Sequence, residues 1–132
     1  MRVKAVVLLT AAFVLVFFAM GIPYWQIPYA KASLPDSLYG PSLGLLLAAA
    51  VIVRLFSDAS FRKTAVVIGS AVPASVMARV VVETALDPTS HNLWPFEMII
   101  ASAVGLAMAT VGSLVGGLLA KLLKKRAFHG GA

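Results

Sequence analysis

Residues 64–96 read TAVVIGSAVPASVMARVVVETALDPTSHNLWPF, and this stretch decides the fold. It joins an apolar segment, with Pro73 near its middle, to a polar run that begins at Asp87. Most of the residues that are costly to place in a membrane lie here, including Arg79 and Glu83, which are one helical turn apart. The stretch therefore predicts a membrane helix that carries its own charge pair.

The composition of the whole chain argues against a water-soluble domain. Of 132 residues, 61% are hydrophobic and 12% are charged, and the mean hydropathy is +0.96. A soluble protein of this size could not bury so much apolar surface. We therefore expect one domain, residues 1–132, with an all-α fold: a polytopic membrane protein built as a bundle of four transmembrane helices.

Four apolar runs give the expected spans. They lie at about residues 5–22, 40–56, 64–86 and 95–123. Three are long enough to cross a hydrocarbon core of roughly 30 Å, and the second reaches spanning length only if it starts near residue 40. Pro41 then falls in its first turn, where a missing N–H is tolerated. We expect Pro73 to kink the third span.

Lysine and arginine are distributed very unequally between the two ends of these spans. Nine lie at one end, namely Arg2, Lys4, Arg54, Arg62, Lys63, Lys121, Lys124, Lys125 and Arg126, and Lys31 alone lies at the other. Basic residues resist translocation, so we expect both termini in the cytoplasm of a bacterial inner membrane. The bias argues against dual-topology multidrug exporters, and its position beside helix ends argues against nucleic acid as a partner.

The absence of cysteine and the composition of residues 21–32 exclude further classes of protein. The chain has no cysteine, which removes disulfides, thiolate metal sites and quinone-linked thiol oxidases. The basic N-terminus and first apolar run imitate a signal peptide, but residues 21–32 are too long and bulky for a cleavage region, so we expect the segment to be retained.

The polar residues of the third span and the following loop form an expected intramembrane cluster. It comprises Arg79, Glu83, Asp87, Glu97 and His91. An arginine at this depth costs about 2.5–3.5 kcal/mol, and Glu83 at i+4 is the first candidate to offset this. The cluster is interpreted first as a structural clamp. Anion recognition by Arg79, proton exchange at Glu83 or contact with a partner subunit remain alternatives.

Neither a metal site nor catalysis is supported by the spacing of these residues. His91 could join Asp87 and Glu97 around a divalent ion, but no histidine-rich pattern accompanies it. Thr89 and Ser90 lack a recognisable base and orienting group. We expect no cofactor, no metal and no enzymatic activity.

Small residues predict where helices approach closely. Gly40, Gly44 and Ala48 form a small-xxx-small stripe, which we expect to pack within the chain, while packing between chains remains open. Gly105, Gly112 and Gly116 mark the richest close-packing surface, on the last span. The third and fourth spans are expected to form the tight centre of the bundle.

The ends of the spans carry residues suited to a membrane interface. Aromatic side chains occur at Tyr24, Trp25, Tyr29 and Tyr39, and are expected to form a belt at the headgroup level. Lys121, Lys124, Lys125 and Arg126 form a basic end on the last span, which fits anionic lipid headgroups. Membrane lipids are therefore expected partners.

Two runs carry a resemblance to known proteins. At residues 87–97 and 34–41 the sequence resembles small, functionally uncharacterised four-helix inner-membrane proteins of proteobacteria, over most of the chain. That resemblance implies no activity. The run at 39–44, YGPSLG, is also similar to the small four-helix subunits of tripartite solute transporters.

These observations lead to two functional hypotheses. The first is a non-enzymatic inner-membrane subunit or scaffold that associates through glycine-rich helix faces, as a homo-oligomer or in a larger membrane complex. The second is an oligomeric transporter, flippase or channel that uses Arg79 and Glu83 for anion recognition or proton coupling. A holin-like pore former is disfavoured by the buried charges.

Overall fold

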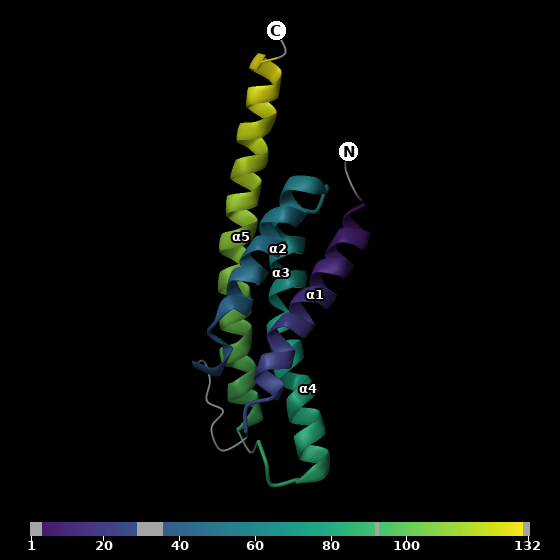
Figure 1. Cartoon of the computed structure of the whole chain (residues 1–132), viewed down its shortest axis with the longest axis vertical. Helices are drawn as coiled ribbons and strands as arrows, with labels where there is room; N and C mark the ends of the chain where they lie inside the picture. Colours follow the sequence, from purple (N-terminus) through teal and green to yellow (C-terminus); the bar gives the residue numbers. More distant parts are fainter. Residues whose placement is uncertain (1–3, 29–35, 92, 131–132) are drawn as a thin grey trace.

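The structure is a computed structural model that describes residues 4–28, 36–91 and 93–130. The described residues form helices and no strand, which confirms the all-α part of the predicted fold class. The helices are α1 (Ala5–Trp25), the short 3-10 turn η2 (Asp36–Leu38), α2 (Pro41–Phe56), α3 (Phe61–Gly69), α4 (Ala71–Leu86) and α5 (Trp94–Gly130). In Figure 1 the chain runs down α1, up α2, down α3 and α4, and up α5, so both termini lie at the same end.

Three of the four expected spans have the length and hydropathy needed to cross a membrane. These are Ala5–Trp25, Phe61–Leu86 and Trp94–Arg126. The fourth, α2, is an apolar helix of 16 residues and so measures about 24 Å, less than a typical hydrocarbon core. It begins at Pro41 with Gly40 before it, within one residue of the predicted start.

The first span is longer than the sequence predicts, because Pro23 lies inside α1 and does not end it. A proline has no N–H, so the carbonyl of Ala19, four residues earlier, loses its helical partner. The hydroxyl of Ser42 at the start of α2 donates to that carbonyl at 2.7 Å. The helix continues for two more residues because the neighbouring helix replaces the missing donor.

The predicted third span is divided into α3 and α4 at Ser70, three residues before Pro73. Pro73 cannot donate to the carbonyl of Gly69, so the helical ladder is interrupted at that point. The Gly69 carbonyl faces Gly105 of α5, where a Cβ atom would collide with it. The interruption at Ser70 therefore lies where Gly69 and Gly105 are in close contact.

Helix α5 packs against α3 and also extensively against α2. The centre of the bundle therefore includes α2, which the sequence did not predict. At Gly112 a Cβ would lie 2.7 Å from the backbone oxygen of Leu47, and at Gly116 it would lie 2.8 Å from that of Val51. These small residues let the two backbones approach closely.

The glycine stripe of α2 faces away from the other described helices. A Cβ built on Gly44 meets no described atom within 4 Å, and Gly44 and Ala48 are both exposed. The same holds for a Cβ on Gly40, whose φ of 155° suits glycine. The expectation that this stripe packs within the chain does not hold for the described residues.

The end of the bundle that holds the termini is fixed by Arg54. Its Nε donates to the carbonyl of Ser113 on α5 at 3.2 Å, and its Nη1 donates to the carbonyl of Ala59 at 3.1 Å. Ser113 in turn donates through its hydroxyl to the carbonyl of Phe61. One arginine and one serine thus join α2, α3 and α5 at this end.

The surface of the bundle is apolar along most of its length. Large hydrophobic side chains such as Val81, Leu106 and Leu118 are exposed, which suits contact with acyl chains. Figure 1 shows α5 projecting well beyond the other helices at its C-terminal end. Its basic residues are exposed there: Lys121, Lys124, Lys125 and Arg126.

Candidate functional site

The candidate site is built at the end of the bundle opposite the termini, where α1 stops. Pro28 follows that helix and cannot donate to the carbonyl of Tyr24, four residues before it. The Tyr24 carbonyl accepts one hydrogen bond from the Ile27 N–H at 3.2 Å, and both it and the Ile27 carbonyl can accept a further donor at the negative end of the α1 dipole. A cation placed here is favoured by both the dipole and the acceptors.

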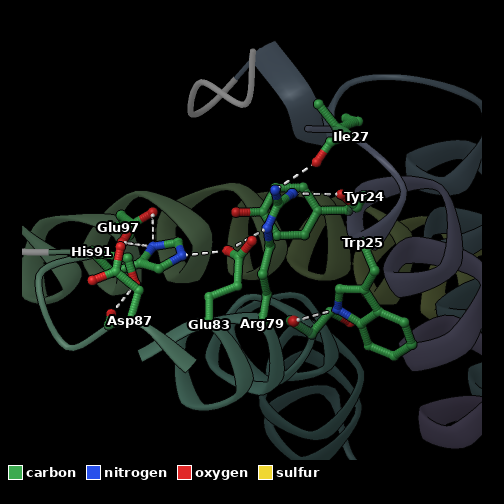
Figure 2. Close-up of polar contacts among 10 residues, drawn as sticks. Tyr24, Trp25, Ile27, Arg79, Glu83, Asp87, His91 and Glu97 are labelled. Atoms are coloured by element: carbon green, nitrogen blue, oxygen red, sulfur yellow. Dashed lines mark hydrogen bonds and ion pairs between the residues drawn. The ribbon is translucent and has the colours of Figure 1, made fainter. Parts of the chain in front are cut away.

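Arg79 of α4 occupies this position (Figure 2). Its Nη1 donates to the Tyr24 carbonyl at 2.7 Å, its Nη2 donates to the Ile27 carbonyl, and its Nε donates to Glu83 Oε1 at 2.8 Å. The guanidinium carbon also lies 4.8 Å from the centre of the Tyr24 ring, within cation–π range. Each guanidinium nitrogen thus has an acceptor, and the residue is only 5% exposed.

Glu83 connects Arg79 to the loop before α5. The same oxygen, Oε1, lies within hydrogen-bond distance of His91 Nε2, and the other ring nitrogen, Nδ1, lies 2.8 Å from Glu97 Oε2. His91 has a φ of 53°, a left-handed conformation that few non-glycine residues adopt. The turn brings the imidazole between the two carboxylates, where it is buried.

Each contact of the His91 ring with a carboxylate requires a proton between the two atoms. A neutral imidazole has one donor and one acceptor nitrogen, whereas both nitrogens here face carboxylate oxygens. The two contacts are satisfied by an imidazolium between two carboxylates, or by a neutral ring with one protonated carboxyl. With Arg79 included, the network is then electrically neutral, which suits its depth in the bundle.

We call the chain of contacts from the Tyr24 and Ile27 carbonyls through Arg79, Glu83 and His91 to Glu97 the polar relay. It joins the end of α1, the last turns of α4 and the first turn of α5. Trp25 adds a second link between α1 and α4, because its indole N–H donates to the carbonyl of Ser75 at 2.9 Å.

Comparison of this chain with protein-family models, with curated proteins and with solved structures finds no match.

Asp87 is the predicted cluster member that the structure leaves outside the polar relay. It is exposed, and its Oδ1 accepts hydrogen bonds from the hydroxyl of Thr89 at 2.7 Å and from the Thr89 backbone N–H at 3.0 Å. These two hydrogen bonds hold the pKa of Asp87 below its ordinary value, and the bond from the hydroxyl has the larger effect. Asp87 therefore stabilises the α4–α5 turn and makes no contact with Arg79.

The relay's acceptors on α1 were not predicted from the sequence. Tyr24 was assigned to an interfacial aromatic belt, but it is 1% exposed and packs against Arg79. Tyr39 is 59% exposed, in keeping with the belt, while Tyr29 lies outside the described residues. The sequence signal for this site is Pro28, because it indicates that the helix ends before it, at a terminus whose dipole favours a cation.

The described residues contain no group of three His, Cys, Asp or Glu side chains arranged to hold a metal ion. Beside the relay lies a surface groove of about 470 Å³. Its lining is Trp25, Ala78, Arg79, Val82, Glu83 and Leu86. The arrangement can hold a proton between His91 and its carboxylates, and it can hold three helix ends together.

Proposed function

We propose that this chain is a small integral protein of the bacterial inner membrane that acts as a non-enzymatic subunit or scaffold. The observation that supports this best is that every nitrogen of the Arg79 guanidinium has an acceptor within the chain. Its three nitrogens donate to acceptors of the chain itself, and the side chain is almost fully buried. An arginine bonded in this way holds helices together. Binding a solute instead would break its hydrogen bonds to Glu83 and to the carbonyls at the end of α1.

The proposed orientation places both termini in the cytoplasm. The fold supports it, because Lys4, the α2–α3 turn and the basic end of α5 lie at the same end of the bundle. In this orientation the polar relay faces the periplasmic side of the membrane, and the projecting end of α5 enters the cytoplasm.

Association would use the exposed stripe of α2. The glycines of α5 are already engaged against α2 and α3, whereas Gly44 and Ala48 present a small-residue surface to the membrane. Such a surface lets a helix of another chain approach closely. We expect that partner to be a second copy or another subunit of a larger membrane complex.

The proposal is tested by measuring assembly of the full chain in mild detergent and in nanodiscs, with native mass spectrometry of what is copurified from its own membrane. We expect wild type to run as a complex and Gly44→Val to run as a monomer with unchanged helix content, because nothing in the described chain opposes the added methyls. Ala11→Val, also on an exposed helix face, is the matched control and should leave the complex intact. A wild-type chain that is monomeric in both media would contradict the proposal.

The second candidate is an oligomeric transporter, flippase or channel, and the observation in its favour is the groove beside the relay. Arg79 and Glu83 both line the groove, so an anionic group could approach Arg79 and a proton could reach Glu83. This candidate expects flux in reconstituted liposomes that Glu83→Gln abolishes. Flux that is absent in wild type, in vesicles where the complex forms, favours the scaffold.

A further inference from the structure

A second polar site lies at the opposite end of the bundle from the relay. It is a cavity of about 260 Å³ between the α2–α3 turn and α5. Its lining is Arg54, Ser57, Asp58, Ala59, Gly117, Ala120, Lys121 and Lys124. Three cationic side chains and one carboxylate therefore surround it, and the excess of positive charge selects for an anionic ligand.

The cationic wall is held in place by the fold. Arg54 is fixed by hydrogen bonds from Nε to the Ser113 carbonyl and from Nη1 to the Ala59 carbonyl. Its guanidinium lies against Gly117, where a Cβ atom would collide with Nη2. A glycine at this place in α5 thus makes room for the arginine at the side of the cavity.

Lys121 and Lys124 follow Gly117 on the same face of α5, at spacings of four and three residues. Both are exposed, on the part of α5 that projects past the other helices. Long ammonium side chains in this position reach the cavity while their stems lie along the helix. The site therefore combines one preorganised guanidinium with two mobile cations.

The surroundings of the cavity are apolar, as a lipid requires. Phe56 precedes the α2–α3 turn and is 52% exposed, while Leu118 and Leu122 are exposed on the adjoining face of α5. This end of the bundle is where apolar helix surface gives way to basic residues, the level at which headgroups lie. A phosphate in the cavity would leave acyl chains beside these side chains.

We propose that this cavity binds the phosphate of one anionic phospholipid headgroup per chain. The proposal goes beyond the scaffold function, because it assigns a defined site and a ligand class to a different end of the molecule. It also differs from general attraction of a basic helix to a membrane, which would involve all four basic residues after Ala120 equally.

The test is native mass spectrometry of the full chain with phosphatidylglycerol, phosphatidylcholine or inorganic phosphate added, using two double variants of equal charge change. We expect one phosphatidylglycerol to be retained, at least about tenfold less in Lys121→Gln/Lys124→Gln, and within twofold of wild type in Lys125→Gln/Arg126→Gln. All four positions are exposed, so neither variant removes a buried contact.

Three results would overturn the proposal. Equal losses in the two double variants would indicate general electrostatic attraction without a site. Equal retention of phosphatidylcholine and phosphatidylglycerol would remove the requirement for an anionic headgroup. Saturable binding of inorganic phosphate without retention of phosphatidylglycerol would assign the cavity to a free anion. Assembly of the complex is measured separately, so failure here is distinct from failure of the scaffold proposal.

Discussion

At the scale of single residues, the protein offsets the cost of an arginine in the membrane with acceptors from two helices. Arg79 would cost about 2.5–3.5 kcal/mol in lipid if it were unpaired. Its Nε is paired within α4 by Glu83, and its two terminal nitrogens are paired by the carbonyls at the end of α1. The residue is tolerated because its guanidinium donates to two backbone carbonyls at the C-terminal end of α1.

Replacing Arg79 should therefore destabilise the fold. Arg79→Met leaves the carbonyls of Tyr24 and Ile27 without these donors and Glu83 without its guanidinium partner, and we expect a loss of about 3 kcal/mol in the free energy of unfolding. Reversible unfolding in mixed micelles measures it. Arg62→Met, an exposed arginine at the start of α3, is the control and should change stability by less than about 0.5 kcal/mol.

The stability of the turn after α4 should fall when the pH is lowered far enough to protonate Asp87. The pKa of Asp87 is lowered by the Thr89 hydroxyl and N–H, so its ionised form stabilises the turn above its ordinary pKa. That contribution is lost as the pH falls through the lowered value. We expect Thr89→Val to raise the pKa of Asp87 towards the ordinary 3.8, measured by carbon NMR of the labelled carboxyl.

Ser90→Ala is the control for that titration, because the Ser90 hydroxyl donates to the backbone oxygen of Asp87 and not to its carboxyl group. The midpoint in this variant should equal that of wild type. If Thr89→Val and wild type titrate at the same pH, the hydroxyl contributes nothing to the carboxylate and the explanation fails.

The contacts of the polar relay differ in how far apart their residues lie in the sequence, and this decides which of them could be predicted. The pair between Arg79 and Glu83 is local, since i and i+4 share a helix face, and the sequence alone indicates it. The contact between His91 and Glu97 depends on a left-handed residue in a loop, which no periodicity reports. The contacts with the end of α1 join residues more than fifty positions apart.

At the scale of helices, prolines explain where the observed elements differ from the predicted ones. Pro23 was expected outside the first span, and Pro73 was expected to bend a continuous helix. At Pro23 the freed carbonyl of Ala19 accepts a hydrogen bond from Ser42, and at Pro73 the freed carbonyl of Gly69 lies against Gly105. Sequence patterns show that a donor is missing, but they do not show which neighbour lies against the freed carbonyl.

The compensation at Pro23 can be measured with a double-mutant cycle. Ser42→Val removes the donor to the Ala19 carbonyl and should cost about 1 kcal/mol in the free energy of unfolding. In a Pro23→Ala background the helix supplies its own N–H, so the same change should cost close to nothing. Additive effects of the two substitutions would show that they do not share this carbonyl.

The contact between α2 and α5 gives a second test at this scale. Gly112→Val places methyl groups against the Leu47 carbonyl and Ala50, and we expect at least about 1–3 kcal/mol of destabilisation by overpacking. Gly44→Val, on the open side of α2, should leave the thermal stability of the monomer unchanged. Equal losses from both substitutions would mean that α2 packs through a different face.

At the scale of the whole molecule, we predict that α2 crosses the membrane although it is short. With 16 residues it is about 6 Å shorter than a typical hydrocarbon core. Local thinning of the bilayer and a polar residue at the end of the helix accommodate such a mismatch at modest cost. Arg54 stands at that end and is bonded to backbone carbonyls, which reduces its cost at the interface.

Single cysteines test this prediction directly, since the natural chain has none. If α2 crosses, Thr89→Cys should react with an impermeant maleimide added outside intact spheroplasts, while Lys4→Cys, Ser60→Cys and Lys124→Cys should react only after permeabilisation. If α2 does not cross, three spans remain, and Thr89→Cys should label from the same side as Lys4→Cys while Lys124→Cys labels from the other. All four positions are exposed, so accessibility is decided by the side of the membrane and not by burial.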